Sequence, residues 1–297
     1  MRWRGNRQSS NVEDRSGSSG QSIGKVATAG GGIGALVIAL IVFFVSGGNL
    51  GTVTDTLGGN IAPTAYETTN TVTKDYTEQK EFAAVVFAHL EDYWNQEFTN
   101  RNTAYQNPKL VLFSNSVNSA CGQASSQVGP FYCPADQNVY LDLSFADELS
   151  TKYGATGDYA MAYVIAHEVG HHVQNELGIS EQVDKIRDRV STTEYNQYSV
   201  RLELQADYLA GCFSKYLAGR TYQGQPILEE GDLEEALTAA NAIGDDTLQK
   251  EYQGYVVPDS FTHGTSQQRI NWFKRGYQYG DLEHGNTFNK QNLDLAS

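Results

Sequence analysis

The residues best suited to chemistry are two histidines that bracket a glutamate, in the pentapeptide HEVGH at 167–171. On a helix, His167 and His171 project from one face, one turn apart. That spacing lets both imidazoles reach a single zinc ion at about 2.0–2.1 Å. Glu168 then lies close enough to take a proton from a water molecule that the metal has made acidic. The pattern predicts one zinc ion with hydrolytic chemistry. Because isolated histidines are more often core residues than ligands, a further ligand is needed.

A source of that ligand is the helical stretch RLELQAD at 201–207. Glu203 and Asp207 are four residues apart and therefore share a helix face. One carboxylate can complete the metal shell, and the other can accept the remaining N–H of a ligand histidine, which fixes its tautomer. Two solvated surface carboxylates are the alternative. Against it, the pair lies among apolar residues that form a stripe: Leu202, Ala206, Leu209 and Phe213.

These residues must be positioned by a domain in which helices outnumber strands. Strands are predicted at Lys109–Phe113 and at Asn138–Phe145, where apolar and polar residues alternate. Asp158–Leu177 is predicted as the helix that carries the histidines, closed by Gly178 at a C-cap position. Helical periodicity also marks 75–98, 180–190, 195–218, 231–250 and 266–278. Few strands followed by many helices predict an α+β domain, mostly helical with a small sheet.

The charge of the chain is unevenly distributed. The formal net charge is −14, which disfavours nucleic acid as a partner. Residues 1–25 are nevertheless basic and rich in Ser and Gly, so we expect a disordered tail there. Val26–Val45 is a run of twenty residues without a charge. As a helix it would be about 30 Å long, the thickness of a bilayer's hydrocarbon core.

Residues 26–45 are therefore predicted to form one transmembrane helix. The alternatives are a buried core helix and a cleaved signal peptide, whose apolar core is shorter, about 7–15 residues, and ends in an Ala-x-Ala-like site. Basic residues precede the run, which places the tail at 1–25 in the cytoplasm and the rest outside. Residues 46–74 then form a linker. We expect a single-pass protein of the cell membrane with an extracytoplasmic domain.

The cysteines agree with that location. Cys121 and Cys133 flank a Gly- and Ser-rich stretch and can close a short loop by a disulfide, which oxidising compartments favour. Two reduced thiols are the alternative. Neither cysteine belongs to a Cys-x-x-Cys pair, so a structural zinc site is disfavoured. Cys212 lies on an apolar helical stretch and is expected to be a buried small hydrophobic residue.

Longer blocks of sequence carry a family resemblance: GPFYCP at 129–134, VYLD at 139–142, HEVGHHVQ at 167–174, RLELQADYLAG at 201–211 and HGTSQQR-INWF at 263–273. With these blocks the chain resembles the bacterial neutral zinc metallopeptidases, a zincin-type group. The match covers roughly residues 75–280, and the ordered blocks are more specific than the short zinc motif. The sequence is also similar to the wider gluzincin pattern, in which a Glu-x-x-x-Asp helix supplies the third ligand. The resemblance implies a zincin-like metallopeptidase domain at 75–290.

The resemblance also implies roles for the site residues. It makes His167, His171 and Glu203 the ligands of one zinc ion, Glu168 the general base, and Asp207 the group that orients a ligand histidine. The 31 residues between His171 and Glu203 exceed the separation in thermolysin. That departure leaves the rival ligands Glu194 and Glu176 open.

His263 is a further candidate, in the loop ahead of a helix that Thr265 and Gln268 can begin with a capping box. Gluzincins commonly use a histidine or tyrosine from a later segment to stabilise the oxyanion, so the resemblance implies a catalytic role; a surface histidine is the alternative. Arg269 can pair with a buried acid or be a solvated helix charge. His172 is expected to pack beside the site. The resemblance suggests that the strand at 138–145 binds extended substrate, and an ordinary structural strand is the alternative.

The predicted function is a membrane-anchored zinc metalloendopeptidase that hydrolyses peptide bonds in peptide or protein substrates. A different class of protein is the alternative: a catalytically inactive zincin-fold adaptor in an envelope assembly. Glu168 argues against the adaptor, because neither folding nor metal binding requires it. Zinc-dependent hydrolysis of a non-peptide amide is a third reading. The sequence indicates neither an oligomeric state nor a cleavage specificity.

Overall fold

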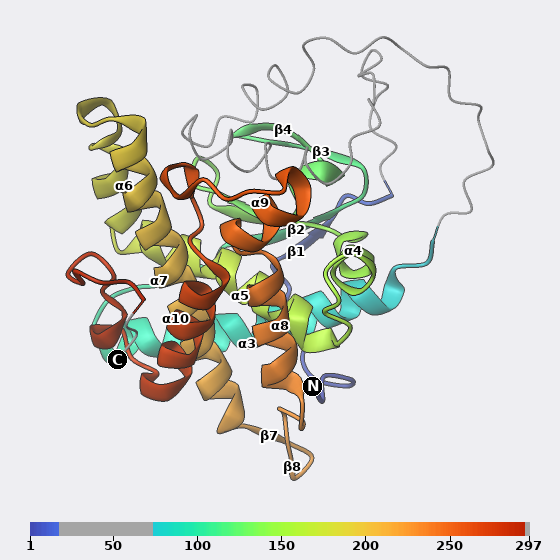
Figure 1. The fold of residues 1–297 in the computed structure, drawn as a ribbon. Helices are drawn as coiled ribbons and strands as arrows, with labels where there is room; N and C mark the ends of the chain where they lie inside the picture. Colours follow the sequence, from blue (N-terminus) through green and yellow to red (C-terminus); the bar gives the residue numbers. More distant parts are fainter. Residues whose placement is uncertain (18–73, 295–297) are drawn as a thin grey trace, which may run out of the picture.

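The computed structural model describes residues 1–17 and 74–294 of the chain (Figure 1). Helices form the larger part of the described domain, and β1 and β2 of a four-stranded sheet lie above α3 and α5 in the view of Figure 1. The helices are α3 (Thr77–Asn100), α4 (Phe145–Thr151), α5 (Asp158–Glu176), α6 (Ile179–Asp184), α7 (Thr192–Ala218), α8 (Asp232–Ala242), α9 (Asp245–Gln253) and α10 (Ser266–Tyr279). The predicted α+β class, mostly helical with a small sheet, is confirmed.

The sheet has the strand order β1 (Val12–Asp14), β2 (Lys109–Phe113), β6 (Asn138–Asp142) and β5 (Phe131–Cys133). The first three strands are parallel, and β5 runs antiparallel to β6. Successive side chains of a strand point to opposite faces. In β2, Leu110 and Leu112 accordingly join the main core, whereas Val111 and Phe113 join a smaller apolar cluster on the other face.

Two short hairpins complete the strands of the described residues: β3 (Ser116–Ser119) with β4 (Gly122–Ser125), and β7 (Thr221–Tyr222) with β8 (Gln225–Pro226). The predicted disulfide is present. It joins Cys121, between β3 and β4, to Cys133 at the end of β5, with the two Cα atoms 5.8 Å apart. Cys212 is buried, as predicted.

Small residues let the helices that carry the predicted site approach closely. A Cβ atom at Gly170 of α5 would lie 3.2 Å from the backbone of Ala206 on α7. A Cβ at Gly276 of α10 would lie 1.9 Å from the carbonyl oxygen of Tyr208 on α7, which no real Cβ tolerates. Since a glycine has no Cβ, α5, α7 and α10 pack side by side (Figure 1).

The helix boundaries differ from the predictions in one important place. The pattern at 231–250 predicts one helix, but the chain forms α8 and α9 with a break at Gly244. A Cβ at Gly244 would lie 2.3 Å from the backbone nitrogen of Ser266, so the break allows α10 to begin beside it. Gly178 closes α5 with φ of 69°, and Thr265 and Gln268 form the predicted capping box.

The predicted strand at Asn138–Phe145 is too long, and it is not a sheet edge. The Asp142 carboxylate accepts hydrogen bonds from the backbone N–H and hydroxyl of Ser144, at 2.7 and 2.6 Å, and this turn ends β6 before α4 begins. β6 also lies between β2 and β5. Among the described strands the edge on this side is therefore β5.

The prediction of a disordered tail at 1–25 is wrong for residues 1–17. Trp3 is buried and packs edge-on against Phe82 of α3, with ring centroids 5.5 Å apart. β1 extends the sheet, with Val12 beside Leu110 of β2. Composition misled here because backbone pairing and buried hydrogen bonds, such as that of Ser9 with Glu91 at 2.6 Å, hold a segment that has few apolar residues.

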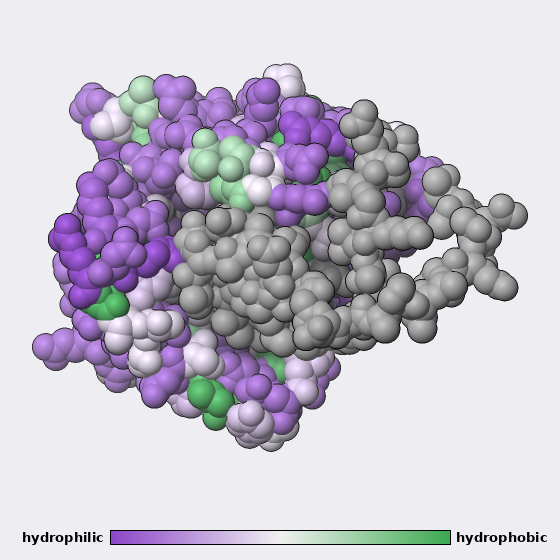
Figure 2. Space-filling model, turned by 90° about the horizontal axis from the view of Figure 1, so that it is seen from above, coloured by the Kyte–Doolittle hydropathy of each residue, from purple (hydrophilic) through white to green (hydrophobic). Residues whose placement is uncertain are grey.

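The predicted transmembrane helix at 26–45 and the linker at 46–74 lie outside the described residues, apart from residue 74. Within 1–17 and 74–294, the helices are too short or too polar to span a bilayer. Seen from above, the described residues present a mainly hydrophilic face (Figure 2). This surface fits a chain with a net charge of −14.

Candidate metal centre

The two histidines of the HEVGH motif meet the carboxylate of Glu203. His167 and His171 lie one turn apart on α5, with ring centroids 4.8 Å apart and planes at 90°. Glu203 approaches both rings from α7. Its Oε2 lies 3.1 Å from Nε2 of His167, and its Oε1 lies 3.4 Å from Nε2 of His171.

One potential ligand atom from each residue lies within 4.8 Å of the others, so His167, His171 and Glu203 can surround a single ion. Neither rival carboxylate belongs to this group of the described residues. Glu194 lies in the first turn of α7 and is exposed, and Glu176 is the last residue of α5. Glu203 therefore meets both histidines although the connection between α5 and α7 is long.

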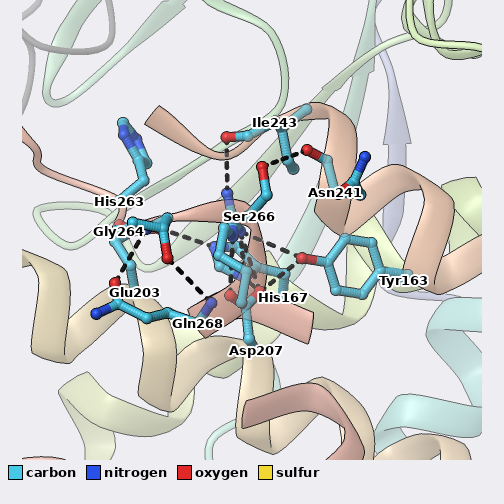
Figure 3. A network of polar contacts seen from close by, with 12 residues as sticks. Tyr163, His167, Glu203, Asp207, Asn241, Ile243, His263, Gly264, Ser266 and Gln268 are labelled. Atoms are coloured by element: carbon cyan, nitrogen blue, oxygen red, sulfur yellow. Dashed lines mark hydrogen bonds and ion pairs between the residues drawn. The ribbon is translucent and has the colours of Figure 1, made fainter. Parts of the chain in front are cut away.

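Asp207 contacts the ring nitrogen of His167 that points away from Glu203. Its Oδ1 lies 2.8 Å from Nδ1 of His167 and accepts the hydroxyl hydrogen of Tyr163 at 2.6 Å. Arg269 donates to both oxygens of Asp207, at 2.8 and 3.0 Å, in the bidentate arrangement that binds carboxylates most strongly. Figure 3 shows His167, Asp207 and Tyr163 within this network. Burial raises the pKa of Asp207, but the charges of Arg269 and His167 outweigh burial and lower it.

Gln174 contacts Nδ1 of His171, as Asp207 contacts Nδ1 of His167. Its Oε1 accepts a hydrogen bond from Nδ1 of His171 at 2.9 Å, while its Nε2 donates to the carbonyl oxygen of Leu202 at 2.7 Å. Since Nε2 is committed as a donor, Oε1 must face the histidine. Asp207 and Gln174 thus draw the Nδ1 protons of both histidines away from the centre, and leave each Nε2 as an acceptor.

This arrangement fits a zinc ion. The inward-facing Nε2 atoms of His167 and His171 can accept but not donate in the neutral rings, and Glu203 can only accept. Glu203 is 2% exposed, and its Oε1 receives no hydrogen bond from the described residues. Buried acceptors that converge in this way favour a cation between them, either a metal ion or a proton on one of the rings. Two imidazoles and one carboxylate are also the donor set of a common class of catalytic zinc site.

The pKa values of His167 and Glu203 also indicate that the site favours a positive charge. Burial lowers the pKa of His167, but the negative charge of Asp207 and hydrogen bonds with Asp207 and Glu203 outweigh burial and raise it to about 10. Burial raises the pKa of Glu203, yet the charges of His171 and His263 hold it well below its usual value. Without a metal, therefore, a proton on His167 supplies the cation.

Glu168 borders the same cavity as these three residues. The cavity has a volume of about 190 Å³, and its walls include His167, His171 and Glu203. Burial raises the pKa of Glu168, although the neighbouring histidine charges oppose that rise. A carboxylate with a raised pKa is a better proton acceptor than an exposed one.

His263 also lines the cavity, so the structure places it at the site and not on an open surface. Asp245, the first residue of α9, holds it in place. One carboxylate oxygen lies 3.1 Å from Nδ1 of His263, and the other accepts the backbone N–H groups of Thr262, His263 and Gly264 at 2.7 to 3.0 Å. Burial lowers the pKa of His263, but the charges of Asp245 and Glu203 outweigh burial and raise it.

His172 turns away from the centre and packs in the core, as predicted. It is fully buried, with Nε2 2.6 Å from the carbonyl oxygen of Gln106 and Nδ1 3.1 Å from the hydroxyl of Tyr132. Arg269 is the buried partner of an acid, which was one of the two alternatives, and is only 2% exposed.

Three residues of the site are absent from the sequence prediction: Tyr163, Gln174 and Asp245. Tyr163 and Gln174 could have been found, because they lie four residues before His167 and three after His171 on the same helix, and so face the same way. No local pattern predicts the role of Asp245, because it lies at the start of α9, 18 residues before His263 in the sequence.

A helical centre of two histidines and a glutamate, bordered by a partly buried general-base candidate, defines the class of zinc-dependent hydrolases. The chain belongs to the family described as "Putative neutral zinc metallopeptidase", which matches residues 1–288. This match includes the N-terminal segment as well as the domain.

Two relatives show how far the similarity extends. The uncharacterized protein YpfJ of Escherichia coli is 47% identical over 295 residues, covering 98% of this chain and 99% of the relative. An uncharacterized protein of Mycobacterium tuberculosis is 42% identical over 195 residues, covering 64% of this chain and 65% of the relative. No solved structure matches the chain.

Proposed function

We propose that this protein is a zinc-dependent endopeptidase whose catalytic centre is formed by His167, His171 and Glu203, with Glu168 as general base. One observation carries the proposal. The acceptor atoms of the three ligands converge within 4.8 Å, and Glu168 borders the same cavity. A structural metal site would be closed by a fourth protein ligand, whereas a catalytic one keeps a position for water or substrate.

The chain's own residues supply the proton transfers. A zinc ion, when bound, lowers the pKa of a water molecule and polarises the scissile carbonyl group. Glu168 accepts the proton of the attacking water and then delivers it to the leaving nitrogen. The raised pKa of Glu168 favours the first step, because it makes the carboxylate a better proton acceptor.

His263 is suited to stabilise the carbonyl oxygen as it gains negative charge. Its raised pKa favours the protonated ring, which is a hydrogen-bond donor. Asp245 holds both the ring and the backbone around it, so little reorganisation is needed when charge develops.

The edge strand β5 is the expected binding site for extended substrate. The cavity wall includes Pro130, Phe131 and Tyr132 at the start of β5. A peptide can add backbone hydrogen bonds to the edge strand of a sheet, and pockets for its side chains then set specificity. The cavity walls are largely apolar, with Phe145, Tyr153 and Val164 among them, so we expect an apolar side chain next to the cleaved bond.

The disulfide between Cys121 and Cys133 supports a working place outside the cytoplasm, because such bonds persist in oxidising compartments. We therefore propose an extracytoplasmic catalytic domain, with membrane attachment through residues 26–45.

The test compares the full chain with Glu168→Gln for bound zinc and for cleavage of a peptide library. The variant should keep one zinc ion per chain and lose cleavage by a factor of a thousand or so, on the order of what removal of a catalytic group costs. Glu176→Gln, the same change at the end of the same helix, is the matched control and should retain both. Equal cleavage by Glu168→Gln would overturn the mechanism. Bound zinc without cleavage in the parent chain would favour the inactive adaptor.

A further inference from the structure

The N-terminal amino group lies buried in an acidic site at the base of the domain. The nitrogen of Met1 is 2.6 Å from Oδ1 of Asp158 and 3.1 Å from Oδ1 of Asp232. Glu229 contributes a third carboxylate at 3.6 Å. Asp158 is the first residue of α5, and Asp232 is the first residue of α8, so one ammonium group joins the starts of two helices.

The geometry of this site suits an ammonium group. Asp158 and Asp232 belong to a cluster with Glu235 in which the carboxylate oxygens lie within 4.8 Å of one another. Like charges at that separation are unfavourable without a cation, and the Met1 nitrogen supplies one. Glu235 is occupied elsewhere, since it accepts the backbone N–H of Tyr159 at 2.9 Å.

The rest of residues 1–17 is bound along its length. The backbone N–H of Arg2 donates to the carbonyl oxygen of Ile227 at 2.8 Å. Further along, Ser9 and Asn11 both donate to the Glu91 carboxylate of α3, at 2.6 and 2.7 Å. The segment then enters the sheet as β1 (Figure 1). These contacts can form only if residues 1–17 and the catalytic domain lie on the same side of a membrane.

We propose that residues 1–17 are part of the folded catalytic domain and lie in the same compartment as it, with the nitrogen of Met1 held by Asp158 and Asp232. A chain that crossed a membrane once between residues 17 and 74 would separate the two and break every contact just described. The proposal therefore replaces both the predicted cytoplasmic N-terminus and the predicted single crossing of the membrane by residues 26–45. It does not depend on the proposed peptidase activity.

The compartment is tested by thiol labelling of the full chain in intact cells and after lysis. Ser10→Cys lies on the exposed part of the N-terminal segment, and Tyr255→Cys lies on an exposed loop of the domain. The native cysteines give little background, because two form the disulfide and Cys212 is buried. With a membrane-impermeant maleimide, both variants should label in the same sample, whether in intact cells or only after lysis. Labelling of one from outside and of the other only after lysis would overturn the proposal.

The contact between Met1 and Asp232 is tested by thermal unfolding. Asp232→Asn should lower the unfolding midpoint by several degrees, because it weakens the attachment of the N-terminal segment to α8. Glu234→Gln, at an exposed position of α8, is the matched control and should leave the midpoint unchanged. An unchanged midpoint in Asp232→Asn would overturn the assignment of this contact.

Discussion

Nδ1 of His167 lies 2.8 Å from Oδ1 of Asp207, and this contact links the metal-facing ring on α5 to the interior of α7. Asp207 is fully buried and is held in turn by Arg269 of α10. Three helices therefore set the direction in which His167 presents Nε2.

Asp207→Asn should weaken zinc binding by about 10- to 100-fold, the usual effect of losing the partner of a ligand histidine. The asparagine fits the same space but removes the charge that supports His167 and pairs with Arg269. Competition with a chromophoric chelator measures the change in dissociation constant. Glu194→Gln, at an exposed position of α7, serves as control. Unchanged affinity in Asp207→Asn would show that the contact does not orient the ligand.

Zinc should bind more tightly as pH rises. The pKa of His167 is raised to about 10 in the metal-free protein, chiefly because the negative charge of Asp207 outweighs burial. The ring is therefore protonated at neutral pH, and a metal ion must displace that proton. Each proton released makes the apparent affinity rise about tenfold per pH unit below this pKa. Chelator competition at several pH values between 6 and 9 gives the slope, and proton release can be measured directly. A flat profile would contradict the prediction.

Gly276→Ala should destabilise the domain by about 1–3 kcal/mol, the usual cost of overpacking a core. The new Cβ would meet the carbonyl oxygen of Tyr208 at 1.9 Å, so α10 must move away from α7. That movement carries Arg269 away from Asp207, and zinc affinity should fall as well. Chemical denaturation measures the first effect. Lys274→Ala, at an exposed position of the same helix, should change stability by less than about 0.5 kcal/mol.

The N-terminal amine should make stability depend on alkaline pH. Burial lowers its pKa, but the hydrogen bonds and charges of Asp158 and Asp232 outweigh burial and raise it above its ordinary value. A raised folded-state pKa contributes stability that is fully present below the unfolded pKa of about 8 and is lost as pH rises through the folded one. The unfolding midpoint should therefore fall above pH 8, and fall less in Asp232→Asn. Parallel curves for the two proteins would refute the linkage.

The parts of the site that share one helix could be predicted from the sequence. His167, Glu168 and His171 follow from helical spacing, and so does the shared face of Glu203 and Asp207. The rest depends on contacts between distant segments. The spacing could not show that Glu203 faces both Nε2 atoms while Asp207 faces Nδ1, since either carboxylate could have taken either place.

The sequence by itself determined the α+β class, the helix that bears the histidines, the disulfide pair and the family, because helical periodicity, capping and motif order are local properties. Only the tertiary structure decided that β5 is the edge strand, that Asp245 supports His263, and that Met1 binds Asp158 and Asp232. The two contacts of Met1 join residues that are separated by 157 and 231 positions in the sequence. Such pairings depend on how close the packed helices approach one another, and no local pattern in the chain encodes that distance.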